Sequence, residues 1–224
     1  MTESIKLMRL NLMMTKYYWK DILLAVIIFT IALLPNIPLV LNIVLFIAAN
    51  TLLSYPFMIE EKDKMDKFYS IIAVTKKDII KSKYLMAIFY MLMISVFLIP
   101  FNLMLYYVMK VKLSFLGVLL LISIGMFLYS VVSAIQLPCY FKWGYARTKI
   151  ITIVLPFLIG LGVPIVVVTG RLLVGKEMMF HIGEIITGFL MNHYSLLIGS
   201  IGVGVILSFY LSYKISKKIY GNTK

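Results

Sequence analysis

The most regular feature of the chain is a series of long hydrophobic stretches without charged residues, separated by short polar or charged segments. Near the start of the chain, no charged residue occurs between Ile22 and Ile59. This stretch is too long for one membrane-spanning helix, which needs about 20 apolar residues, and Pro-Asn-Ile-Pro at residues 35–38 supplies a turn near its middle. The whole pattern predicts an all-α integral membrane protein with six transmembrane helices, at about 17–35, 39–59, 84–108, 115–137, 150–169 and 194–213.

Residues 60–83 interrupt the hydrophobic pattern most strongly, because they contain twelve Asp, Glu and Lys side chains. Each Lys or Asp costs roughly 3 kcal/mol at the centre of a membrane helix, so this segment must lie in water. Glu60 and Lys64 are four residues apart and are expected to pair on a helix surface. The segment predicts a short amphipathic helix over residues 60–74, with apolar positions at helical spacing: Met65, Phe68, Tyr69 and Ile72.

A second helix is predicted to begin directly after this segment. Thr75 can cap its N-terminus, and Asp78 stands at the third helical position, which gives a shorter-armed capping box. Val74 and Ile79 can pack on each other as a hydrophobic staple. This helix can continue into the span at 84–108. The charged segment is therefore predicted to be a rigid connection between two spans, with an apolar stripe that can contact a soluble partner.

Two other segments have features typical of a membrane surface. Residues 4–16 predict an interfacial helix, because the basic side chains of this region fall within an arc of about 80° when residues are placed at 100° intervals. These side chains are Lys6, Arg9, Lys16 and Lys20. Residues 138–149, PCYFKWGYARTK, are too aromatic and basic for a flexible linker, and we expect a compact interfacial loop there.

The charge balance gives the expected orientation. The chain of 224 residues is 62% hydrophobic and carries a formal net charge of +13. In a soluble domain this charge would suggest a nucleic-acid partner, but here 18 of the 22 Lys and Arg residues fall on one side of the expected spans. The positive-inside rule then places both termini and residues 60–83 in the cytoplasm, with the lipid bilayer and no nucleic acid as partner.

Polar residues inside the expected spans are sparse and uncharged. The candidates for a translocation path are Asn42, Asn50, Ser54, Asn102, Ser130 and Gln136. The alternative is that these side chains only hydrogen-bond neighbouring helices. Proton relays are normally built from ionisable side chains within the membrane, so the pattern disfavours a secondary transporter and indicates that another polypeptide supplies the energy.

Two motif-like patterns do not predict a site. Residues 170–177 resemble a phosphate-binding P-loop, but Glu177 replaces the Ser or Thr that binds Mg²⁺. His181, Glu184 and His193 lack the spacing of a metal site, and the single cysteine, Cys139, excludes an internal disulfide. We therefore expect no catalytic, cofactor-binding or metal site in the chain, and no enzyme activity of its own.

The charged segment and the layout around it resemble a known family. The relevant residues are Glu61, Met65 at a position where Trp is common, residues 72–79 (IAVTKKDI), and Lys83-Tyr84 before the third span. Residues 136–138 (QLP) and 141–145 (FKWGY) add to the likeness. In these motifs and in its six-span layout, the chain resembles the type-2 ABC exporter permeases, and among them the small Gram-positive branch that includes the phenol-soluble modulin exporter permeases.

The resemblance implies a permease subunit in the bacterial plasma membrane, with residues 1–224 forming one transmembrane domain. Its partners would be two copies of a cytoplasmic ABC ATPase subunit, which use ATP and Mg, and a second permease, either an identical or a sister chain. The helix 60–74 would be the coupling helix, and the exported cargo would be an amphipathic or hydrophobic peptide or a lipid-like molecule. The implied ATPase-contact residues are Met65, Asp66, Lys67, Phe68, Tyr69, Ile72, Thr75, Lys76 and Lys77.

Other interpretations stay open on the sequence. The protein could be a bacteriocin or antibiotic exporter, or an immunity permease, of the same family. A non-transporting membrane immunity or sensor protein would need no ATPase partner. The apolar stripe of residues 60–74 could also pack back on the membrane or on residues 138–149 and contact no partner at all.

Overall fold

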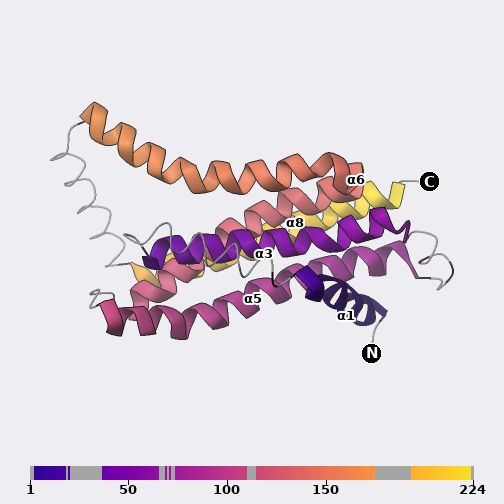
Figure 1. Cartoon of the computed structure of the whole chain (residues 1–224), viewed down its shortest axis with the longest axis horizontal. Coiled ribbons are helices and arrows are strands. Elements are labelled where there is room, and N and C mark those ends of the chain that lie inside the picture. Colours follow the sequence, from indigo (N-terminus) through magenta and orange to yellow (C-terminus); the bar gives the residue numbers. More distant parts are fainter. Residues whose placement is uncertain are drawn as a thin grey trace.

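The computed structural model describes residues 3–18, 20, 37–65, 69, 71, 74–109, 115–174 and 193–222. Within these residues all regular secondary structure is helical, which confirms the predicted fold class at this level. The long helices form one elongated bundle, with α1 packed against its side (Figure 1). The elements are α1 (Glu3–Thr15), η1 (Lys16–Tyr18), α3 (Ile37–Lys62), α5 (Lys76–Met109), α6 (Phe115–Val174) and α8 (Tyr194–Asn222).

Three of the described helices contain stretches long and apolar enough to cross a membrane: Lys76–Met104, Phe115–Ile151 and Tyr194–Gly221. They cover most of the spans expected at 84–108, 115–137 and 194–213. The spans expected at 39–59 and 150–169 lie within α3 and α6, whereas the span expected at 17–35 falls almost entirely outside the described residues. The six-span count stays a prediction.

Side-chain contacts fix the directions of the central helices. Asn50 of α3 hydrogen-bonds Ser133 of α6, and further along both helices Phe57 stacks on Tyr140. The pairs advance together, so α3 and the first half of α6 run parallel. α5 runs in the opposite direction to α3, and the end of α3, the start of α5 and the end of α8 all lie at one end of the bundle (Figure 1). We call this the junction end.

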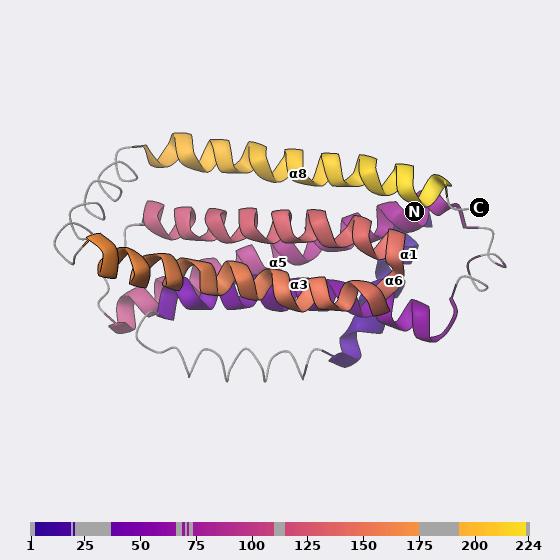
Figure 2. The same ribbon diagram turned by 90° about the horizontal axis from the view of Figure 1, so that it is seen from above.

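Helix α6 corrects the loop expected at residues 138–149. These residues are helical, and the chain instead reverses direction at Gly144, whose backbone has φ 74° and ψ 177° (Figures 1 and 2). Only glycine adopts this conformation readily, so this one residue reverses the direction of the chain where a longer interfacial loop was expected. The two halves of α6 therefore meet in a sharp turn at the junction end.

Helix α1 matches the helix expected at 4–16 to within one residue at each end. Its basic side chains are exposed, as the pattern predicts. The opposite ridge is buried and mostly polar, and it packs against α5: Ser4, Leu7, Asn11 and Thr15. Thr15 makes a 2.7 Å hydrogen bond with the hydroxyl of Tyr90, which holds the end of α1 against the middle of α5.

The helix expected at 60–74 does not begin at Glu60, which corrects its predicted start; most of residues 66–73 lie outside the described residues, so the helix itself stays a prediction. α3 continues through Glu60 to Lys62, and the chain then turns at Lys64, which has φ 50°. The backbone N–H of Met65 donates to the carbonyl of Glu60 at 3.0 Å, which is the closing bond of a Schellman motif. Beyond the turn, Tyr69 and Ile71 are helical.

The N-cap predicted at Thr75, before α5, is confirmed, and Asp78 also bonds its hydroxyl. The backbone N–H of Asp78 donates to Thr75 Oγ1 at 3.2 Å, and the Thr75 hydroxyl donates to Asp78 Oδ2 at 2.5 Å. Val74 and Ile79 pack in one small cluster, as a hydrophobic staple requires. The start of α5 is thus fixed by local interactions.

Candidate functional site

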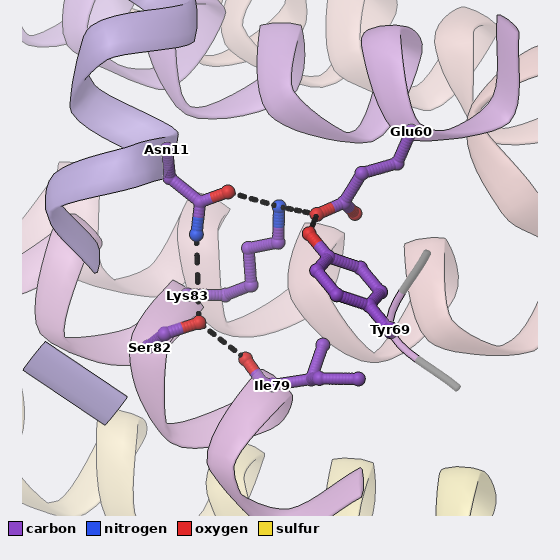
Figure 3. A network of polar contacts seen from close by, with 6 residues as sticks. All are labelled: Asn11, Glu60, Tyr69, Ile79, Ser82 and Lys83. Atoms are coloured by element: carbon purple, nitrogen blue, oxygen red, sulfur yellow. Dashed lines mark hydrogen bonds and ion pairs between the residues drawn. The ribbon is translucent and has the colours of Figure 1, made fainter. Parts of the chain in front are cut away.

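The most unusual side chain at the junction end is Lys83, near the start of α5, which is 0% exposed. Its ammonium group donates to Glu60 Oε1 at 2.6 Å and to Asn11 Oδ1 at 3.0 Å (Figure 3). The ammonium nitrogen also lies 4.6 Å from the centroid of the Phe57 ring. A buried ammonium is very costly unless it is paired and hydrogen-bonded, and here three neighbours compensate the charge.

Glu60 connects this lysine to the segment between α3 and α5. The hydroxyl of Tyr69 donates a short hydrogen bond to the same carboxylate oxygen that accepts from Lys83 (Figure 3). Tyr69 is only 5% exposed and packs against Leu7 and Ile79. Any displacement of this segment that moves Tyr69 must therefore disturb the ion pair.

Helix α1 is bound into the same network by polar contacts. The amide nitrogen of Asn11 lies 3.4 Å from Ser82 Oγ, and the Ser82 hydroxyl in turn donates to the carbonyl of Ile79 (Figure 3). Nearer the starts of both helices, the Ser4 hydroxyl donates to Asp78 Oδ1 at 2.7 Å. We call Asn11, Glu60, Tyr69, Ser82 and Lys83 the polar junction, because they join α1, α3, α5 and the segment between α3 and α5.

Glu61, next to the polar junction, holds the turn of α6. Its Oε2 atom accepts from the backbone N–H groups of Tyr145 at 2.5 Å and Ala146 at 3.1 Å. These groups belong to the first turn of the helix that follows Gly144, where backbone N–H groups lack intrahelical partners and a negative charge is favourable. A carboxylate from α3 therefore caps the second half of α6.

The residues expected to contact an ATPase have different environments. Tyr69 is buried, and Met65 is partly buried in the same small cluster, whereas Thr75, Lys76 and Lys77 are exposed. Ile71, which the sequence pattern did not single out, is 82% exposed. Asp66, Lys67, Phe68 and Ile72 lie outside the described residues.

The six residues expected on a translocation path are all buried inside the bundle. Five of them make hydrogen bonds: Asn42 bonds Asn102, Asn50 bonds Ser133 and the carbonyl of Phe46, and Ser54 and Ser130 bond carbonyls of their own helices. Asn42, Asn50 and Asn102 thus join neighbouring helices, as the alternative expects, whereas these bonds of Ser54 and Ser130 stay within their own helices. Only Gln136 differs, because both polar atoms of its amide lack a hydrogen-bond partner in the described part of the chain.

Replacing Gln136 with Met is expected to stabilise the chain by about 1–3 kcal/mol, the usual cost of an unsatisfied buried polar group. Methionine is close in size and brings no hydrogen-bonding atoms that need a partner. Thermal unfolding of the purified protein in detergent measures the change. Asn50→Leu is the matched control and should destabilise, because Asn50 is buried like Gln136 but hydrogen-bonded. A loss of stability in Gln136→Met would contradict this expectation.

Sequence reasoning missed the central ion pair. It assigned Glu60 a partner four residues away, Lys64, but Lys64 lies in the left-handed turn and Glu60 pairs with Lys83 instead. A usable signal was present, because Lys83 is the last charge before a long uncharged stretch and Glu60 is the first charge after another. Opposite charges at the ends of two helices that follow each other in the chain can lie close together and form an ion pair.

The other motif-like patterns form no site in the part of the chain that the structure describes. The P-loop-like segment is helical as far as Val174 and does not form a phosphate-binding loop in its described part. Among the described residues, no group of His, Cys, Asp and Glu could hold a metal ion. His181 and Glu184 lie outside those residues.

An all-helical bundle with three described helices long and apolar enough to cross a membrane indicates a helical membrane protein. The chain matches the family model described as ABC-2 family transporter protein over residues 6–221. It therefore belongs to the ABC-2 transporter family, as the resemblance at the motif level implies. No match is found among curated proteins or among solved structures.

Proposed function

We propose that the chain is the membrane-spanning permease subunit of an ABC exporter. The observation that carries this proposal is the family match, which extends over residues 6–221. In such an exporter, a separate cytoplasmic ATPase subunit, present in two copies, hydrolyses ATP with Mg. The permease binds neither and pairs with a second permease, either an identical or a sister chain. We place the junction end in the cytoplasm of a bacterial cell because most Lys and Arg residues are expected on that side.

We propose that the segment between α3 and α5 contacts the ATPase through its exposed side chains. Ile71 is a large apolar residue that is almost fully exposed, and Lys76 and Lys77, which follow the segment, are exposed as well. Full burial of an isoleucine contributes roughly 1.5–3 kcal/mol, while the lysines favour an acidic partner surface and set its orientation. Asp66, Lys67, Phe68, Ile72 and the exposed Thr75 complete the proposed contact, with Met65 and Tyr69 behind it.

The polar junction supports a route for transmitting movement from this contact. Tyr69 belongs to the segment that carries the proposed contact and bonds Glu60, and Glu60 pairs with Lys83 at the start of α5. A push on the segment by the ATPase would therefore reach α3 and α5 through buried, hydrogen-bonded groups. Such groups transmit displacement well because they have few alternative arrangements.

We propose that the cargo is an amphipathic or hydrophobic peptide or a lipid-like molecule. Support comes from the sequence of the spans, which carry polar amides and hydroxyls but no ionisable residue among the candidate path positions. Gln136 is the best candidate for a path residue, because its buried amide has no hydrogen-bond partner among the described residues and would be available to a cargo group when the bundle opens. If it binds cargo, Gln136→Met will stabilise the chain and reduce export together.

Co-purification tests the proposed function. The tagged chain, extracted in mild detergent, is expected to retain a stoichiometric polypeptide that mass spectrometry identifies as an ABC ATPase, with ATPase activity in the eluate. Ile71→Asp should abolish both, because it places a charge in the apolar contact without disturbing a buried residue. Ile71→Val keeps the apolar surface and should retain both.

A correctly folded chain that elutes alone and without ATPase activity would contradict the proposal. That result would favour a non-transporting membrane immunity or sensor protein. If Ile71→Asp retained the ATPase, the contact surface would be wrong while the exporter assignment would stand.

A further inference from the structure

Glu60 and Glu61 are adjacent in the last turn of α3, yet their carboxylates serve different helices. Successive residues of an α-helix point about 100° apart, so two neighbours on one helix can face two different packing partners. Glu60 accepts from Lys83 of α5 and from Tyr69. Glu61 accepts from the backbone of Tyr145 and Ala146 in α6.

The Glu61 contact holds the α6 turn with little freedom. A Cβ atom at Gly144 would lie 3.0 Å from Glu61 Oε2, so the carboxylate sits directly against the backbone of the turn. The turn also presents Trp143, which is exposed, with the Lys142 ammonium 4.9 Å from the centroid of its ring. The position of this exposed surface therefore depends on the position of Glu61.

The Glu60 contact is equally constrained on the other side of the helix. Its side chain is 16% exposed and is bound to a lysine that is 0% exposed. The helix carrying both carboxylates ends immediately afterwards in the Schellman motif at Lys64. Glu60 and Glu61 are consecutive residues of this last turn, so a movement of its backbone shifts both carboxylates together.

We infer that Glu60 and Glu61 are positioning residues that couple the segment between α3 and α5 to the α6 turn. Loss of contacts in the polar junction then weakens the Glu61 cap at the start of the second half of α6. The coupling is a property of the chain alone. It goes beyond the proposed function because it brings a second exposed surface, at Trp143, into any movement that begins at Tyr69.

Hydrogen exchange of the Tyr145 and Ala146 amides tests the inference. Their N–H groups lie in the first turn of a helix, where no intrahelical acceptor exists, so their protection reports on Glu61. The full chain in detergent micelles is compared with its Lys83→Met variant by mass spectrometry of the peptide that contains both residues. We expect exchange about 5-fold faster or more in the variant, the lower range of typical coupling between sites.

Matched variants separate coupling from general loosening. Lys81→Met, at an exposed lysine of the same helix, should leave the exchange of both amides unchanged, and Glu61→Ala should accelerate it directly. Tyr69→Phe removes only one hydroxyl from the polar junction and should act in the same direction as Lys83→Met, so it carries the test if Lys83→Met does not fold. The α8 amides at 205–216 should keep their protection in every variant.

Two results would overturn the inference. One is unchanged exchange at Tyr145 and Ala146 in Tyr69→Phe and in folded Lys83→Met, while Glu61→Ala accelerates it. The other is equal acceleration in α8, which would show that the whole bundle loosens. Because no ATPase takes part, a chain that shows the coupling but binds no ATPase would contradict the proposed function alone.

Discussion

Replacing Glu60 with Ala is expected to destabilise the chain by about 3–5 kcal/mol, the cost of removing one partner from a buried ion pair. The loss is large because Lys83 is 0% exposed, and among the described residues only the side-chain oxygen of Asn11 and the Phe57 ring would remain to compensate its charge. Neither neighbour carries a compensating charge. The midpoint of thermal unfolding in detergent, followed by circular dichroism, measures the effect.

Two comparisons show whether burial is the cause. Glu3→Ala removes the Glu3–Lys6 pair, which has a similar separation of 2.8 Å but side chains that are 56% and 59% exposed. An exposed pair of this kind contributes about 0–1 kcal/mol, so this variant should unfold almost like the parent chain. The double variant Glu60→Leu with Lys83→Met removes both charges and should recover much of the lost stability. If it is no more stable than Glu60→Ala, the explanation from a buried unpaired charge is wrong.

Replacing Gly144 with Ala is expected to have the second largest effect. Its backbone conformation is one that only glycine adopts readily, and forcing another residue into it costs about 1–3 kcal/mol. The new Cβ would also press on Glu61 Oε2 and displace it from the Tyr145 and Ala146 amides. Both hydrogen bonds are exposed to solvent, so weakening them adds only a smaller amount to the backbone cost.

Thermal unfolding measures this change too, with glycines elsewhere in the chain as controls. At Gly199 and Gly202 of α8, an added Cβ would have no atom within 4 Å, and neither residue has a positive φ. Ala at either position should be neutral or stabilising by up to about 1 kcal/mol, because alanine favours a helix more than glycine does. A Gly144→Ala chain as stable as these controls would contradict the role given to the turn.

The sequence predicts well those features that depend on neighbours along the chain. The N-cap at Thr75 and its contact with Asp78 could be predicted because all the atoms lie within one helical turn. The exposed basic face of α1 follows from helical periodicity alone. The apolar helices follow from composition over about 20 residues, which is the length that a bilayer selects.

The features that the sequence did not predict depend on contacts between distant residues. Residues 138–149 have the composition of an interfacial loop, but a single glycine makes the turn once Glu61 is present to cap the next helix. Likewise, Glu60 has a good local partner in Lys64 and a better distant one in Lys83. Sequence patterns predict contacts only between residues that are close along the chain. The contacts of the candidate site join residues that are far apart, so they could be identified only from the packed helices.

The burial of Lys83 also bears on how the protein is made. Every partner that the described residues provide for its ammonium group precedes it in the chain: Asn11, Phe57 and Glu60. A ribosome that has just added Lys83 has therefore already made all of these compensating groups, and the nascent chain need not hold this cation unpaired while later helices are synthesised. Glu61, by contrast, must wait for about 80 further residues before the amides that it caps emerge, which at the usual 5–20 residues per second takes several seconds.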